Sequence, residues 1–134
     1  MLVIDTSALI AIFRLEAEAE SFLKTIVRAE ARVMSALSVL ESSMVMSGGG
    51  DAGSFEPLDD FLIEAGIEIA AFDAGQAKAA RDAFIRFGKG RHKAALNLGD
   101  CASYALAKSR GAPLLYKGDD FRRTDIIAAV PEAA

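Results

Sequence analysis

The sequence is short of the residues from which cross-links and soft-metal sites are built. It contains one cysteine, Cys101, and one histidine, His92, among 134 residues. A single cysteine cannot form an internal disulfide, which agrees with a reducing compartment, and we expect Cys101 to serve as a small apolar residue in a helix. Zinc sites need several His or Cys ligands at short spacing, so the sequence argues against zinc.

Long apolar runs are absent as well. Although 52% of the residues are hydrophobic, no stretch approaches the roughly 18 consecutive apolar residues that a membrane span requires. The chain opens with a strand-like run where a signal peptide would place positive charge. We therefore expect a cytoplasmic protein without a membrane segment. A chain of this length suits one compact domain over residues 1–134, which would bury roughly two-thirds of its unfolded-state surface.

Short apolar runs alternate with helical patterns along the chain. We expect strands at 2–4, 32–34, 67–72, 113–116 and 126–130, and helices at 15–27, 35–45, 57–65, 74–87 and 100–110. This alternation predicts a three-layer α/β domain with a central, mainly parallel sheet flanked by helices. Hydrophobic spacing also predicts two buried stripes, comprising Leu15, Ala19, Phe22, Leu23, Ile26 and Val27 in the first helix, and Leu37, Leu40, Met44 and Val45 in the second.

Acidic residues stand at several positions where acids rarely help folding. Asp5 ends the first apolar run, and Glu41 interrupts an apolar helical pattern. Asp100 opens a helix, and Asp119 and Asp120 follow a strand-like run. The carboxyl ends of parallel strands converge on the crevice where α/β proteins bind ligands, so acids from distant segments are expected to meet there. Carboxylates in one crevice repel one another, and a hard divalent cation such as Mg²⁺ or Mn²⁺ is the usual remedy.

Each acid also has an ordinary structural interpretation. Asp5 and Asp100 suit helix N-caps, Glu41 alone suits a solvated helix position, and Asp119 and Asp120 suit a turn beside a glycine. The positive end of the helix dipole predicts that Asp100 stays ionised and ready to bind metal. The combination of acids, more than any one of them, favours a metal site.

The net charge of −4 conceals an uneven distribution. Residues 1–77 carry 4 basic and 13 acidic side chains, whereas residues 78–123 carry 11 basic and 4 acidic. A basic segment in an acidic chain is the footprint expected for a polyanionic substrate such as a nucleic acid, although any single Lys or Arg more often only solvates a helix. His92 falls in the same basic loop. The cations that we expect to contact phosphates are Arg86, Lys89, Arg91 and Lys93, with Arg81 as a further candidate.

Four short motifs occur in an order that resembles the PIN domain family. They are Val3-Ile4-Asp5-Thr6-Ser7, Glu41 after Ser35-Ala36-Leu37-Ser38, Gly99-Asp100-Cys101, and Lys117-Gly118-Asp119-Asp120-Phe121 with Thr124-Asp125. More narrowly, the chain is similar to the VapC-type ribonuclease toxins of bacterial toxin–antitoxin pairs, over its whole length. It departs from the family at one place. Many PIN domains carry Thr or Ser shortly before the last acid, where this chain has Tyr116-Lys117-Gly118.

The resemblance implies a Mg²⁺- or Mn²⁺-dependent endoribonuclease that hydrolyses RNA phosphodiesters. Attack by a metal-activated water would leave 5′-phosphate and 3′-hydroxyl ends. The resemblance also implies a VapB-type antitoxin that occludes the acidic crevice, and a toxin homodimer. It assigns the metal cluster to Asp5, Glu41, Asp100 and Asp119, with Asp120 as the alternative fourth acid and with Thr6 and Ser7 as hydrogen-bonding support.

Two other classes of protein share parts of this pattern. A receiver-like signalling domain also binds metal through acids at strand ends, but it needs a phosphoacceptor Asp after a central strand and a Lys after a late one. Here the first acid follows the N-terminal strand. A non-catalytic nucleic-acid-binding module would account for the basic segment, but the acids would then be a liability. Metal-dependent cleavage of RNA separates both classes from the nuclease.

Overall fold

The sheet holds four short strands, all of them parallel. In the computed structural model, which describes residues 1–47 and 55–129, the strands are ordered β3-β2-β1-β4. The first strand lies inside the sheet, with Val3 paired to Val33 on one side and to Leu114 on the other. The predicted parallel α/β sheet is therefore confirmed. The strands are β1 (Leu2–Ile4), β2 (Arg32–Ser35), β3 (Ile67–Ala70) and β4 (Leu114–Leu115).

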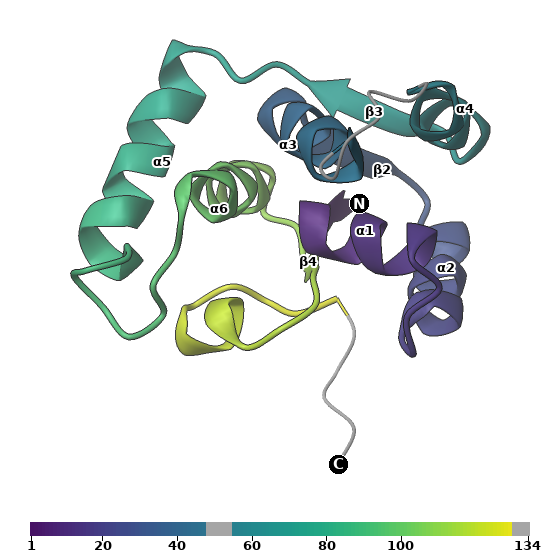
Figure 1. Cartoon of the computed structure of the whole chain (residues 1–134). Helices are drawn as coiled ribbons and strands as arrows, with labels where there is room; N and C mark the ends of the chain where they lie inside the picture. The colour runs from purple at the N-terminus through teal and green to yellow at the C-terminus, as the bar shows by residue number, and fades with distance from the viewer. Residues whose placement is uncertain (48–54, 130–134) are drawn as a thin grey trace.

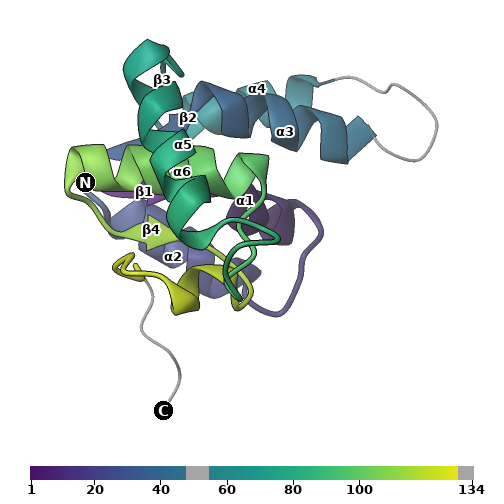
Figure 2. The same ribbon diagram turned by 90° about the vertical axis from the view of Figure 1, so that its left-hand side faces the viewer.

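Helices cover both faces of this sheet and give the predicted three layers (Figures 1 and 2). One core lies between the sheet and α5 and α6, and the other lies between the sheet and α1, α2 and α4. No helix in the described part of the chain is long and apolar enough to cross a bilayer. The helices are α1 (Thr6–Phe13), α2 (Ala19–Arg28), α3 (Ala36–Ser47), α4 (Glu56–Glu64), α5 (Ala74–Phe87), α6 (Leu98–Arg110) and the short 3₁₀ helix η1 (Asp120–Arg123).

The first strand shows why the sequence folds this way. Val3 points into the core beneath α6, while Leu2 and Ile4 point into the core beneath α1 and α2. All three side chains are buried, as expected for a central parallel strand that is covered on both faces. The strand then ends at Asp5, whose backbone N–H still donates to Leu115 O at 2.9 Å.

The first helical segment differs from the prediction. The expected helix at 15–27 is present as α2, but it begins only at Ala19, and a turn at Leu15 separates it from α1. Leu15 has a left-handed backbone, with φ of 53°, and its side chain is 85% exposed. Val27 is also exposed, so the buried stripe of α2 is narrower than predicted and consists of Ala19, Phe22 and Ile26.

The predicted inner face of α3 is wrong. Its buried residues are Ser38 and Ser42, whereas Leu40 is 57% exposed and Met44 is 64% exposed. Ser38 packs inward beside Ser103, with the two hydroxyls 3.2 Å apart, and the Ser42 hydroxyl donates to Ser38 O within the helix. Leu40 and Met44 therefore face outward, while Val39 and Met46 pack against the core.

The ends of the last elements agree with the sequence in part. Gly111 ends α6 as predicted, with a left-handed φ of 58°. The expected strand at 126–130 is reduced to one parallel bridge between Leu114 and Ala128, and Val130 lies outside the described residues.

Candidate active site

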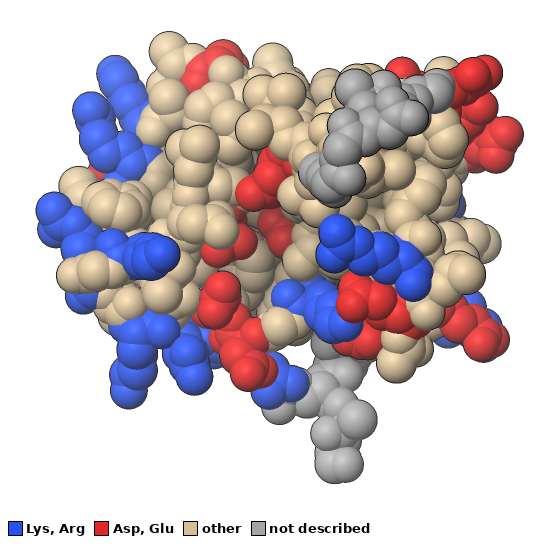
Figure 3. Space-filling model, viewed as in Figure 1, with Lys and Arg blue, Asp and Glu red and all other residues tan. Residues whose placement is uncertain are grey.

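An open cavity of about 460 Å³ lies at the carboxyl edge of the sheet, and Asp5, Glu16, Glu41 and Asp100 are among the residues that line it. Asp5 reaches it from the end of β1, Glu41 from α3 and Asp100 from the first turn of α6. Figure 3 shows acidic side chains in the hollow at the centre of this face, with many Lys and Arg to the left and others beside the hollow on its right. The structure thus brings together three predicted site residues from distant segments.

Asp5 is buried and fully engaged by hydrogen bonds. Ser103 Oγ donates to its Oδ1 at 2.5 Å, while the Ser7 hydroxyl and backbone N–H donate to its Oδ2 at 2.6 and 3.0 Å. The N–H bond makes Asp5 the N-cap of α1 as well, so the ordinary role and the site role coexist. Burial raises the pKa of the Asp5 carboxyl, although the hydrogen bonds from Ser103 and Ser7 oppose this shift.

Glu41 packs directly against the backbone of α6. A Cβ placed on Gly99 would stand 2.2 Å from Glu41 Oε2, so the close approach requires glycine at this position. Burial raises the pKa of Glu41, a hydrogen bond with Thr6 lowers it, and the nearby charge of Asp5 raises it again. Thr6 also donates to Ser38 O at 3.1 Å, which ties α1 to α3 beside the site.

Asp100 is the third residue of α6 and forms a capping box with Asn97. Asn97 Oδ1 accepts from Asp100 N at 2.9 Å, and Asp100 Oδ2 accepts from Asn97 N at 3.1 Å. The helix N-terminus was predicted to keep Asp100 ionised, but in the protein without metal its effect is opposed. Burial, with added repulsion from Asp5, Asp120 and Glu41, outweighs the cap and raises the pKa of Asp100 to about 7.

The two adjacent acids after β4 lie in different surroundings. Asp119 Oδ1 forms an ion pair with Arg122 Nη1 at 3.2 Å, and its side chain is 68% exposed. Asp120 is the one whose charge acts on Asp100 and raises its pKa. Both acids are exposed and neither lines the cavity, so the effect of Asp120 on Asp100 is what favours Asp120 over Asp119 as the fourth carboxylate.

The donor set fits a hard divalent cation by its chemistry. All the converging groups are carboxylates, which Mg²⁺ and Mn²⁺ prefer, and their mutual repulsion would be relieved by a cation. Gly99 leaves room for the Glu41 carboxylate against α6. In the described residues, however, no three Asp, Glu, His or Cys side chains already stand close enough to form a complete ion-binding shell. The carboxylates would need to close further around an ion.

The predicted phosphate-contacting cations lie on and after α5. Lys89, Arg91 and Lys93 are exposed, but the backbone of their loop is held by hydrogen bonds between Lys89 N and Leu96 O and between Leu96 N and Phe87 O, both 3.0 Å. His92 is half-buried, accepts from Ala94 N at 3.0 Å and stacks edge-on against Phe87. Its contacts are therefore those of a structural residue in this loop.

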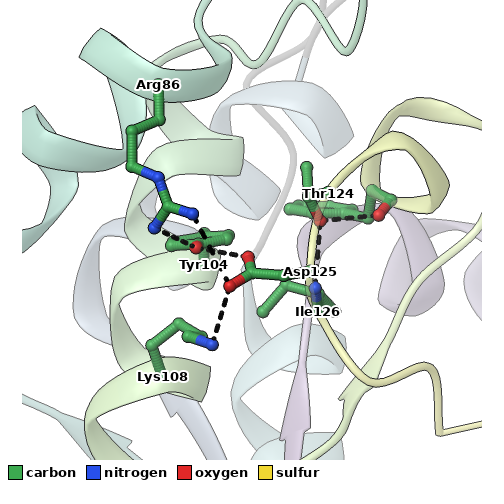
Figure 4. Close-up of polar contacts among 7 residues, drawn as sticks. Arg86, Tyr104, Lys108, Thr124, Asp125 and Ile126 are labelled. Atoms are coloured by element: carbon green, nitrogen blue, oxygen red, sulfur yellow. Dashed lines mark hydrogen bonds and ion pairs between the residues drawn. The ribbon is translucent and has the colours of Figure 1, made fainter.

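Arg86 has partners within the protein. It donates to the Tyr104 hydroxyl at 3.3 Å and lies 3.8 Å from Asp125 Oδ2. Figure 4 shows Asp125 between Tyr104, Lys108 and Arg86, with hydrogen bonds of 2.5 Å from Tyr104 and 3.0 Å from Lys108. These bonds lower the pKa of Asp125, while burial and Asp125 raise the pKa of Tyr104 to about 12. The network ties the segment after η1, and with it Asp120, to α5 and α6.

Sequence reasoning missed several residues that shape the site. Ser103, Ser38 and Asn97 orient the acids, and Lys117 lines the cavity. A signal was available for one of them. Ser103 follows Asp100 by three residues, which places both on one side of α6. The hydroxyl of Ser38 had no comparable signal, because it lies in a helix whose apolar spacing predicted the opposite face.

The sequence matches the PIN domain family over residues 2–127. The chain belongs to the PIN domain family. Among relatives of this PIN domain, "Ribonuclease VapC" of Mycolicibacterium smegmatis is 51% identical over 128 residues, covering 95% of this chain and 98% of that protein. "Ribonuclease VapC30" of Mycobacterium tuberculosis is 48% identical over 126 residues, covering 93% and 95%.

Solved structures share the fold of this PIN domain. The crystal structure of Mycobacterium tuberculosis VapC20, described as a toxin that cleaves the sarcin-ricin loop, has a TM-score of 0.76 with 14% identity and covers 98% of this chain and 100% of that chain. A chain from a toxin-antitoxin complex of Klebsiella pneumoniae has a TM-score of 0.70 with 15% identity, covering 97% and 98%. At such low identity these matches show the fold alone.

Proposed function

We propose that this PIN domain is a metal-dependent endoribonuclease and the toxin of a type II toxin–antitoxin pair. The observation that carries the proposal is the convergence of Asp5, Glu41 and Asp100 on one cavity, with the charge of Asp120 beside them. The names of relatives at about half identity, which are VapC ribonucleases, support the same reaction. They do not favour a receiver-like signalling domain or a non-catalytic nucleic-acid-binding module.

The metal would be Mg²⁺ or Mn²⁺, held by Asp5, Glu41, Asp100 and Asp120, with Asp119 as the alternative fourth ligand. Bound there, such an ion would activate a water for attack on phosphorus and offset charge on the leaving oxygen. The hydrogen bonds from Ser103 and Ser7 would keep the Asp5 carboxylate in one orientation.

The carboxylates would also serve the proton transfer. Asp100 Oδ2 is engaged in the capping box, while Oδ1 stands outside that box. A bound cation would relieve the repulsion that raises the pKa of Asp100. One of the carboxylates around the ion would accept the proton that the attacking water releases.

The exposed cations Lys89, Arg91 and Lys93 would hold the RNA backbone, and Arg86 would contribute from α5. The protein would meet cellular RNA in the cytoplasm. Each phosphate contact adds affinity that salt weakens, because binding releases counterions from the nucleic acid.

A VapB-type antitoxin would occlude the acidic cavity, and an apolar surface beside it suits a homodimer interface. Leu40, Met44 and Leu98 are 57%, 64% and 75% exposed. Leu98 forms a ridge between two apolar hollows of about 330 and 420 Å³, the second of which reaches Phe84 on α5. Large exposed apolar patches mark protein contacts. We propose that a second copy of the chain covers this surface.

The decisive experiment is cleavage of total RNA by the purified protein, with and without Mn²⁺, followed by mapping of the cut ends. We expect 5′-phosphate and 3′-hydroxyl ends, made only with divalent cation and lost on addition of EDTA. The matched control is Asp100→Asn, which should be folded and inactive. Cyclic phosphate ends, or cleavage that persists in EDTA, would contradict the proposed metal-dependent mechanism.

A further inference from the structure

Lys117 follows β4 at the place where the chain departs from many PIN domains, and it lines the acidic cavity. Of the described residues that line this cavity, it is the one Lys or Arg. The cations of the loop after α5 are not among its walls. A cluster of carboxylates repels a phosphodiester, and one divalent ion would leave four carboxylates net negative. A positively charged side chain at the cavity wall would therefore favour binding of a phosphodiester.

The backbone of Lys117 is anchored to the site. Its N–H donates to Ser7 Oγ at 2.9 Å, and Ser7 Oγ in turn donates to Asp5 Oδ2 at 2.6 Å. This connection fixes the start of the Lys117 side chain relative to the carboxylate that ends β1.

The side chain, in contrast, is held by exchangeable partners. Lys117 Nζ lies 2.9 Å from Glu16 Oε2 and 3.3 Å from Glu18 Oε2, both on the turn between α1 and α2. About a third of each of these side chains is exposed, and ion pairs in such surroundings contribute little net stability. A phosphate oxygen could therefore replace Glu16 and Glu18 as the partner of Lys117.

We propose that Lys117 is a substrate-contacting residue, whose ammonium group leaves Glu16 and Glu18 to bind a phosphate oxygen of RNA beside the carboxylate cluster. The inference rests on the proposed ribonuclease function. In this arrangement Glu16 and Glu18 hold the cation ready at the cavity wall and compete with RNA for it.

The alternative is that Lys117 only fastens the turn between α1 and α2. The two roles differ in whether the effect of removing the acids depends on Lys117. If Lys117 binds RNA, the double variant Glu16→Gln with Glu18→Gln frees the ammonium and should tighten RNA binding several-fold, and adding Lys117→Gln should cancel this gain. Lys117→Gln should lower kcat/KM for RNA about tenfold or more, chiefly through KM. Lys117→Arg keeps the charge and should retain most of the activity.

The test measures cleavage of a single-stranded RNA in Mn²⁺, and binding of the same RNA in an Asp100→Asn background. The matched control is Lys24→Gln, which breaks the ion pair between Lys24 and Glu20 outside the cavity and should change neither quantity. Melting temperatures report whether the turn is loosened.

Wild-type kcat/KM in Lys117→Gln would overturn the inference. So would a parallel loss of RNA binding and melting temperature in Lys117→Gln and in the double Glu variant, because that result marks a purely structural fastener. If the wild-type protein cleaves no RNA, the proposed function is wrong, and the inference about Lys117 is wrong with it. That result differs from one in which the wild type cleaves RNA and Lys117→Gln is equally active.

Discussion

Ser103 on α6 donates a 2.5 Å hydrogen bond to Asp5 at the end of β1. The two residues are separated by 98 positions in the sequence. The Ser103 hydroxyl also lies 3.2 Å from that of Ser38 on α3, so one buried side chain joins β1, α3 and α6 beneath the cavity. Both serines are almost completely buried. The orientation of a proposed metal ligand is thus set by residues that never face the substrate.

Replacing Ser103 with Ala should lower metal affinity or cleavage by roughly 10- to 100-fold, as is typical when a metal ligand is deprived of its hydrogen-bond partner. The free energy of unfolding should fall by about 2 kcal/mol, because a buried carboxylate loses a donor. Mn²⁺ titration and initial rates measure the first effect, and denaturant unfolding the second. Ser109→Ala is the matched control, since its hydroxyl bonds Leu106 O on the same helix, outside the cavity. Equal rates in both variants would contradict the assignment.

Stability of the metal-free protein should depend on pH through Asp100. Its pKa is raised from 3.8 to about 7, so between these values the folded protein binds more protons than the unfolded chain. Stability should therefore fall as pH rises through this window. Asp100→Asn cannot ionise and should flatten the slope, although Asp5 and Glu41 will preserve part of it. In EDTA above pH 7 the variant should melt higher than wild type while cleaving no RNA, and a lower melting temperature would argue against a carboxylate cluster.

Gly99→Ala should abolish most cleavage with little loss of helix stability. The new Cβ would fall 2.2 Å from Glu41 Oε2, so the Glu41 carboxylate must move out of its place. Alanine otherwise favours a helix over glycine by about 1 kcal/mol, which limits the structural damage. Gly75→Ala in α5 is the matched control, because its Cβ would meet Asp73 at an ordinary 3.4 Å. Circular dichroism and cleavage rates separate the two effects, and an active Gly99→Ala enzyme would remove Glu41 from the site.

Replacing Lys89, Arg91 and Lys93 together by Ala should weaken RNA binding across sequences and flatten its salt dependence. For single-stranded RNA the logarithmic slope should decrease by about 0.7 for each phosphate that the loop no longer neutralises. Binding is measured in an Asp100→Asn background at several salt concentrations. The control removes three cations elsewhere, Lys24, Arg28 and Lys78. If both triple variants behave alike, the loop only solvates the surface.

The outward side of α3 should determine the oligomeric state. Leu40→Glu combined with Met44→Glu places charge on the proposed dimer surface, and the variant should sediment as a monomer where the wild type sediments as a dimer. Ile63→Glu is the control, since Ile63 is 77% exposed on α4. A wild-type monomer at the same concentration would contradict the proposed interface.

Strands β1 and β4 could be predicted from sequence because they lie in short, wholly apolar runs. Val3 and Leu114 lie in such runs, and both are completely buried. The start of α2 at Ala19 could not be predicted, because Leu15 fits the helical spacing yet adopts a left-handed backbone at a turn. Periodicity records side-chain character and carries no direct information on such a turn.

The acidic residues of the site were predicted because charged residues interrupt apolar runs of the sequence. The serines whose hydroxyls orient these acids were not predicted. Asp5, Glu41 and Asp100 reach one cavity as expected. The inward face of α3 was assigned wrongly because this helix turns its polar side, with Ser38 and Glu41, towards the carboxylates. Amphipathic spacing assumes that the interior is apolar, and that assumption fails where a protein builds a polar cavity.

The position of β1 within the sheet determines when the active site can form during translation. The first strand to be synthesised lies between β2 and β4, and β4 is made only at Leu114–Leu115. Ser103, one of the donors that hold Asp5, and η1, which carries Asp120, also come from the last third of the chain. A nascent chain therefore has an open sheet edge and an incomplete carboxylate cluster until residues 114–123 have been made. Until that point a ribosome that makes this protein would carry an inactive nuclease.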